Sequence, residues 1–140
     1  MNDASSLPIA EFGFPGPLRD QLVAAILERT KTSTTARVSD YEFDNEALPA
    51  VGDRRAVVDS DGRRVAIIET TAVAIARVAD VDVQHAIDEG EGYVTVAGWR
   101  AAHVEFWDSA EMHEYLGEAN AAVTDDTELV LERFRMVELL

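Results

Sequence analysis

The chain has 140 residues, no cysteine and a formal net charge of −15, and 47% of its residues are hydrophobic. These values fit one soluble domain with a single core, and they exclude disulfides, a thiol nucleophile and thiolate metal sites. The first residues lack the basic start and apolar stretch of a signal peptide, and no apolar run approaches membrane-spanning length. We therefore expect a cytoplasmic protein.

The negative charge is concentrated in the second half of the chain. Residues 80–132 contain fourteen acidic residues and one basic residue, Arg100, whereas residues 17–38 contain four basic and two acidic residues. A strongly acidic protein repels nucleic acid and anionic membranes at long range, so we expect weak binding to generic RNA and no membrane partner. Solubility alone is a second explanation of the acidity.

The first half of the chain begins with breakers and aromatic residues, from which we expect a flexible tail over residues 1–11 and one domain over residues 12–140. Pro17 suits a first helical position, and Leu18, Leu22 and Ile26 recur at helical spacing through residue 29. Residues 31–38 then read as a strand, and residues 40–49 as an acidic, irregular segment.

The rest of the chain predicts a pair of strands, then three helices, then a closing strand. Asp61-Gly62 predicts a hairpin between strands at residues 54–59 and 63–71, and residues 72–78 either prolong the second strand or begin another. Helices are expected over residues 83–87, from Thr95 to about Asp108, and over residues 110–119, before a closing strand at residues 128–138. This order favours an α+β fold, a small and mostly antiparallel barrel with helices packed outside it.

Lys31 is the only lysine, and four hydroxyl residues follow it in Lys31-Thr32-Ser33-Thr34-Thr35. A lone amine among hydroxyls suits chemistry or anion binding, although a solvated strand start rich in threonine is a second interpretation. Residues three apart in a strand point to opposite faces, so Lys31 and Thr34 cooperate only if Lys31 belongs to the turn after the first helix. Otherwise Lys31, Ser33 and Thr35 share a face.

The acidic loop Asp88-Glu89-Gly90-Glu91-Gly92 is the second candidate site. Because glycines flank Glu91, we expect its side chain to reach inward toward Lys31 and Thr34, with Glu89 pointing to solvent. One alternative is that the loop is only an exposed acidic rim, and another is that Glu89 or Asp88, instead of Glu91, is the functional carboxylate.

Aromatic and histidine side chains supply further candidates. Tyr41, Tyr93, Trp99 and Trp107 either stack on a base or pack in the core, and His103 either orients a ligand or packs between Trp99 and Phe106. The three histidines, at positions 85, 103 and 113, show no metal-ligand spacing, so we expect no metal and no cofactor.

Four segments in this order resemble a bacterial branch of the ASCH domain family, whose barrel is similar to the PUA domain of RNA-modifying proteins. They are Phe12-Gly13 before a helix, Lys31-Thr32-Ser33-Thr34, the segment from Leu48 to Asp53, and Glu89-Gly90-Glu91-Gly92 followed by Trp99-Arg100 and His103. The likeness spans about residues 12–134.

The resemblance implies RNA binding or a role in RNA or nucleoside metabolism. The family includes ribonucleases, and it also includes amidohydrolases that act on acylated cytidine. Lys31, Thr34 and Glu91 occupy the positions of the lysine, threonine and glutamate of the amidohydrolase members. One departure is Arg29, which stands where the family usually has a glycine able to end the helix in a left-handed conformation.

Two function classes follow. The first is a hydrolase of an amide on a modified pyrimidine nucleoside, in which Lys31 activates Thr34 or polarises the carbonyl and Glu91 carries the proton. Its ligand-binding residues are Ser33, Tyr41, Glu89, Trp99 and His103. The second is a non-catalytic module for single-stranded RNA or a nucleotide, or a ribonuclease. The positive region is small for a polyanion reader, which favours the nucleoside; the oligomeric state stays open.

Overall fold

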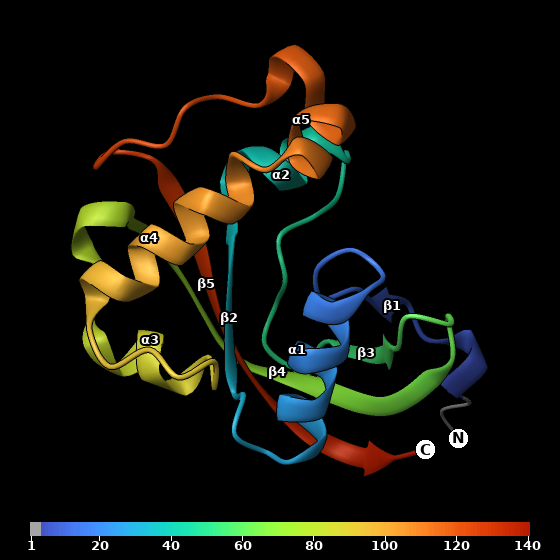
Figure 1. The fold of residues 1–140 in the computed structure, drawn as a ribbon. Coiled ribbons are helices and arrows are strands. Elements are labelled where there is room, and N and C mark those ends of the chain that lie inside the picture. The colour runs from blue at the N-terminus through green and yellow to red at the C-terminus, as the bar shows by residue number, and fades with distance from the viewer. Residues whose placement is uncertain (1–3) are drawn as a thin grey trace.

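The computed structural model describes residues 4–140, which form one mixed five-stranded sheet and five α-helices (Figure 1). The strands are β1 (Ile9–Ala10), β2 (Ser33–Arg37), β3 (Arg54–Val58), β4 (Arg64–Arg77) and β5 (Glu128–Leu139). The helices are α1 (Pro17–Leu27), α2 (Val38–Phe43), α3 (Val83–Asp88), α4 (Val96–Trp107) and α5 (Ala110–Leu116). The α+β class is therefore confirmed.

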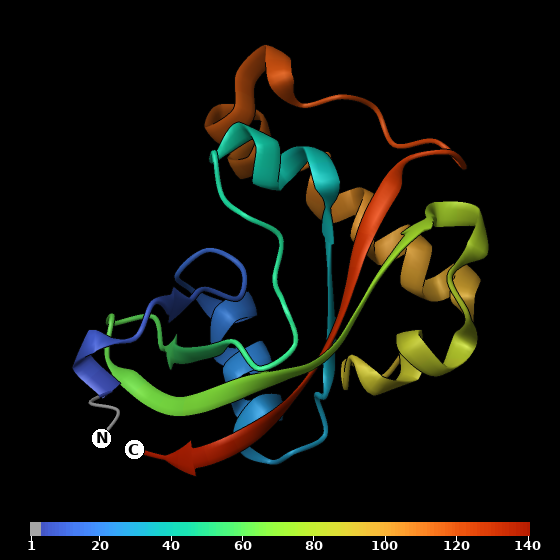
Figure 2. The ribbon, with the colours of Figure 1, turned by 180° about the vertical axis from the view of Figure 1, so that it is seen from behind.

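The sheet is open, so the expected barrel is wrong. The strand order is β1-β3-β4-β5-β2, in which β1 runs parallel to β3 and the other pairs are antiparallel. Register shifts between Ile67 and Ile68 and between Thr70 and Ala72 help the long strands β4 and β5 to bend and twist. Figures 1 and 2 show α1 between the two edge strands, β1 and β2, which do not pair.

The N-terminal segment joins the sheet earlier than expected. Residues 1–3 of the expected tail lie outside the described residues, but Ala4–Ser6 form a 3₁₀ turn. Ile9 and Ala10 then pair with Ala56 and Val57. Strand pairing therefore starts before residue 12, where we expected the domain to begin.

Several expected element ends are present in the structure. Pro17 opens α1, and the side chains of Asp82, Thr95 and Ser109 accept backbone hydrogen bonds at the starts of α3, α4 and α5. The segment 72–78 prolongs β4 as far as Arg77. The short helix α2 was not predicted, because its sequence has no apolar periodicity and residues 40–49 were expected to be irregular.

Two apolar clusters hold the fold together. The first joins α1 to the sheet through Phe12, Leu22, Val23, Ile26, Val57, Ala66, Ile68 and Phe134. The second joins the later helices to the sheet through Val78, Val81, Ala86, Trp99, Trp107, Met112, Leu116 and Leu129. The backbone N–H of Thr32 donates to the carbonyl of Asp88 at 2.8 Å, which ties the segment after α1 to the end of α3.

Among the described residues, no helix has the length and apolarity needed to cross a membrane.

Candidate functional site

Lys31 lies in the turn between α1 and β2, as the change of periodicity predicts. The backbone N–H groups of Thr30 and Lys31 both donate to the carbonyl of Ala25, and Arg29 has a left-handed φ of 66°. The helix therefore ends on a left-handed residue, although this residue is an arginine and not a glycine. The turn directs the Lys31 side chain inward, where only 2% of it is exposed.

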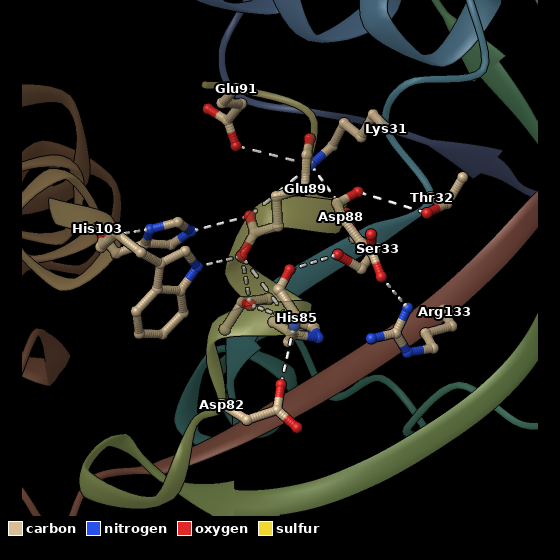
Figure 3. Close-up of polar contacts among 12 residues, drawn as sticks. Lys31, Thr32, Ser33, Asp82, His85, Asp88, Glu89, Glu91, His103 and Arg133 are labelled. Atoms are coloured by element: carbon tan, nitrogen blue, oxygen red, sulfur yellow. Dashed lines mark hydrogen bonds and ion pairs between the residues drawn. The ribbon is translucent and has the colours of Figure 1, made fainter. Parts of the chain in front are cut away.

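The Lys31 ammonium is held by backbone carbonyls and two carboxylates (Figure 3). Its Nζ donates to the carbonyls of Ser33 at 2.9 Å and Glu89 at 3.3 Å, and lies 3.8 Å from Glu89 Oε1 and 3.7 Å from Glu91 Oε2. An ammonium has three N–H donors. Two of them are used by the carbonyls, which leaves the third for Glu91 or a ligand.

Gly90 lets the acidic loop approach this turn closely. Its φ is +72°, and a Cβ at this position would lie 2.6 Å from the carbonyl oxygen of Thr30 and 2.7 Å from the nitrogen of Lys31. No side chain fits there without moving the backbone. Gly90 therefore allows the carboxylates of both Glu89 and Glu91 to lie within 4 Å of the ammonium.

Glu89 is the buried centre of the polar network, and the expectation that it points to solvent is wrong. Its side chain is 2% exposed, against 14% for Glu91. Its Oε2 accepts from Thr35 Oγ1 at 2.9 Å and from Trp99 Nε1, while Oε1 accepts from His103 Nε2 at 3.1 Å. With three donors and the ammonium around it, Glu89 is a fixed buried anion.

The environments of the two carboxylates push their pKa values apart. Burial alone would raise the pKa of Glu89, but the hydrogen bond and charge of His103, the charge of Lys31 and the Trp99 hydrogen bond lower it to about 2. For Glu91, burial is the largest effect and raises the pKa above its usual value; the charge of Glu89 adds to this, while Lys31 opposes it. Glu89 thus stays ionised, and Glu91 is the carboxylate suited to exchange a proton.

The pKa values of the two histidines beside Glu89 are shifted in opposite directions. His103 Nδ1 lies 2.9 Å from the carbonyl of Trp99, and Nε2 faces the Glu89 carboxylate, so both ring nitrogens meet acceptors and both must donate. Burial would lower the pKa of His103, but the hydrogen bond and charge of Glu89 raise it. Burial lowers the pKa of His85, whose Nε2 donates to Thr35 Oγ1 at 2.8 Å while that hydroxyl donates to Glu89.

A cavity of about 760 Å³ opens beside this network, a size that suits a small molecule. Lys31, Glu89, Glu91 and His103 line one part of it, and Thr34 and Thr35 line it from the edge strand β2. Its aromatic lining consists of Phe12, Phe14, Tyr41, Tyr93, Phe106, Trp107 and Tyr115. The lining combines aromatic side chains with charged groups of both signs, which suits a planar polar ligand.

The structure separates the sequence-predicted residues into two groups. Lys31, Thr34, Tyr41, Glu89, Glu91 and His103 line the cavity. Ser33 and Trp99 do not: Ser33 Oγ donates to the carbonyl of His85 at 2.9 Å, the Trp99 indole donates to Glu89, and both residues are fully buried. These two are positioning residues that hold the acidic loop and Glu89 in place.

Thr35, His85, Arg55 and Glu132 are among the polar residues of the site region that sequence reasoning did not assign to it. Thr35 and His85 are linked to Glu89, and Arg55 and Glu132 line the cavity away from Lys31. Thr35 was visible as part of the hydroxyl run. Arg55 and Glu132 carried no local signal, because only the register of the sheet brings them to the cavity.

Glu89, Glu91 and His103 offer three ligand atoms within 4.8 Å of one another, a spacing that would suit a metal ion. The Lys31 ammonium, however, lies against both carboxylates, and His103 presents an N–H to Glu89. The chain's own cations therefore balance this cluster.

Comparison with known proteins gives the family. The model of the ASCH domain family matches residues 9–138, and the chain belongs to this family. It is similar to the crystal structure of protein EF3133 from Enterococcus faecalis, with 26% identity over 94% of this chain and 77% of that chain and a TM-score of 0.80. It is also similar to an ASCH domain from Lactobacillus crispatus, with 32% identity over 85% of this chain and 72% of that chain and a TM-score of 0.71. No curated protein matches the chain.

Proposed function

We propose that the cavity binds a small pyrimidine nucleoside and hydrolyses an acyl group from its exocyclic amine. The observation that carries the proposal is the pair Glu89 and Glu91, two carboxylates on one ammonium with pKa values shifted in opposite directions. Such a pair provides a fixed anion and a proton carrier in one site.

The chemistry is direct hydrolysis of the amide by water. The Glu91 carboxylate takes a proton from water as the water oxygen attacks the acyl carbon, and the free N–H of Lys31 stabilises the negative charge that develops on the carbonyl oxygen. The C–N bond then breaks, and Glu91 returns the proton to the leaving nitrogen, which yields a carboxylate and the free amine. Lys31 Nζ contacts carbonyls and carboxylates, which favours polarisation of the substrate over activation of Thr34.

The charge around the cavity supports a neutral ligand over RNA. One lysine, Lys31, and two arginines, Arg19 and Arg55, line the cavity together with a larger set of acidic residues: Glu11, Asp40, Asp44, Glu46, Glu89, Glu91, Glu105 and Glu132. A polyanion gains affinity by placing phosphates on basic side chains, and this lining offers few of them.

The test is product release from a panel of cytidines acylated on the exocyclic amine, followed by chromatography. The wild type should release cytidine, and Glu91→Gln should lower turnover by about 100-fold or more, within the usual span for a general acid–base residue, with little change in ligand affinity. Glu111→Gln, on the exposed surface of α5, is the matched control and should behave as wild type. Full activity in Glu91→Gln would remove the proton carrier from the proposal.

A further inference from the structure

A second group of polar side chains lines the same cavity without contacting Lys31. It consists of Thr34 on β2, Tyr41 on α2, Arg55 on β3 and Glu132 on β5. Thr34 and Glu132 are directly paired across the two antiparallel strands, so their side chains leave the sheet on the same face. The mechanism proposed above uses none of these four groups to move a proton.

Glu132 is buried but only half of its carboxylate is satisfied. The residue is 5% exposed, and both of its contacts use Oε2, which accepts a hydrogen bond from Thr70 Oγ1 at 2.6 Å and lies 3.9 Å from Arg55 Nη1. Among residues 4–140, Oε1 has no partner. It is not completely enclosed by protein, and Glu132 lines the cavity, so this oxygen is accessible from there. A buried carboxylate oxygen without a donor costs free energy unless a ligand supplies one.

The polar groups near Glu132 also have few hydrogen-bond partners within the described residues. In the described part of the chain, Arg55 has only ion pairs at 3.7 Å to Asp53 and 3.9 Å to Glu132, and the hydroxyls of Thr34 and Tyr41 have no hydrogen bond. Burial raises the pKa of Tyr41 to about 12, and the charge of Glu132 adds to the increase, so this hydroxyl keeps its proton and is able to donate. The group therefore offers a charged acceptor, a charged donor and two hydroxyls to one region of the cavity.

We infer that Glu132, Arg55 and Tyr41 form a sugar subsite that binds the vicinal hydroxyls of a ribonucleoside whose base lies at Lys31. The inference rests on the proposed nucleoside ligand. A hydroxyl donates to a carboxylate and accepts from a guanidinium at once, so it satisfies both Glu132 Oε1 and Arg55, whereas a second cation or anion would satisfy one and repel the other.

The experiment compares the affinities of cytidine and of dideoxycytidine, which lacks both vicinal hydroxyls, by calorimetry. The wild type should bind cytidine at least about tenfold more tightly, the effect of one hydrogen bond to a charged group. Glu132→Gln and Tyr41→Phe should reduce this preference, with cytidine affinity falling and dideoxycytidine affinity little changed. Tyr41→Phe removes only one hydroxyl from a half-buried side chain, so it keeps the comparison interpretable if Glu132→Gln does not fold.

The outcomes separate the subsite from the proposed hydrolysis. A preference for cytidine that the variants abolish supports the subsite even if no acylated cytidine is hydrolysed. Equal affinity for the two nucleosides in the wild type, or failure of both to bind, would overturn the subsite, and it would do so even if acylated cytidine is hydrolysed. An unchanged preference in both variants would assign the hydroxyl contacts to other residues and contradict the inference equally.

Discussion

Replacing Arg29 by glycine should stabilise the protein, because this residue ends α1 in a left-handed conformation. Its φ is 66°, which costs an L-residue about 1–2 kcal/mol. Glycine avoids that strain but gains about 0.5–1 kcal/mol of freedom in the unfolded chain. The central values of these two ranges leave a net gain in the free energy of unfolding of about 0.75 kcal/mol, or roughly 2–4 °C in Tm for a domain of this size.

The structure predicts little loss to offset this gain. Arg29 is exposed, and its side chain has no hydrogen bond or ion pair in the described part of the chain. The backbone hydrogen bonds of Thr30 and Lys31 to Ala25 remain, so the position of Lys31 should not change.

The assay is urea unfolding followed by tryptophan fluorescence, with Arg29→Ala as the matched control. Alanine removes the same charge but keeps the Cβ that causes the strain, so Arg29→Ala should not gain stability. Equal stabilisation by both variants would attribute the effect to charge, and destabilisation by Arg29→Gly would refute the reasoning about backbone strain.

Three further predictions concern the polar network. Gly90→Ala should destabilise the fold by about 2 kcal/mol or more and abolish nucleoside binding, because its Cβ would lie 2.6 Å from a backbone atom. Gly92→Ala is the control: its φ is +90° but no atom lies within 4 Å of the added Cβ, so this variant should lose only the stability that the backbone strain costs. Denaturation and nucleoside-binding assays on the two variants side by side check both expectations. The folded-state pKa of Glu89 is depressed from 4.5 to about 2, so its stabilisation is present above pH 4.5 and lost as the pH falls toward 2. The loss amounts to ~3 kcal/mol, and a Glu89→Gln variant whose stability falls as steeply over that range would contradict it. Lys31→Arg should lose turnover nearly as fully as Lys31→Ala, because the wide guanidinium cannot take the place of a side chain 2% exposed between two carbonyls; substantial turnover in the arginine variant would reduce the lysine to a simple charge.

Local signals predicted most of the elements. Capping residues such as Asp82 and Thr95, and the glycine turn between β3 and β4, act within a few residues, so the sequence alone located them. Sheet closure was predicted wrongly because it depends on the lengths and bends of strands far apart in the chain. The two-residue strand β1 carried no pattern to read.

The same distinction between local signals and contacts of distant segments applies to the candidate site. The hydroxyl residues after Lys31 and the glycines beside Glu91 identified the two segments that meet. The absence of a side chain at Gly90 explains why they approach so closely. The roles of Glu89 and Trp99 could not be predicted, because they depend on a buried hydrogen bond between a loop and a helix. A sequence with alternating carboxylates does not show which one faces inward.

Mapping the bound nucleoside by nuclear magnetic resonance tests the central claim most directly. Cytidine titrated into nitrogen-15-labelled protein should produce saturable shifts in the backbone amides of Thr34 and Glu91, which line the cavity, and of Gly90, which lies between the cavity residues Glu89 and Glu91. The amides of Ala121 and Val123, which line a separate smaller hollow, should stay unchanged. Saturable shifts confined to that smaller hollow, or no saturable shift at any amide, would contradict the claim that the cavity beside Lys31 is a nucleoside site.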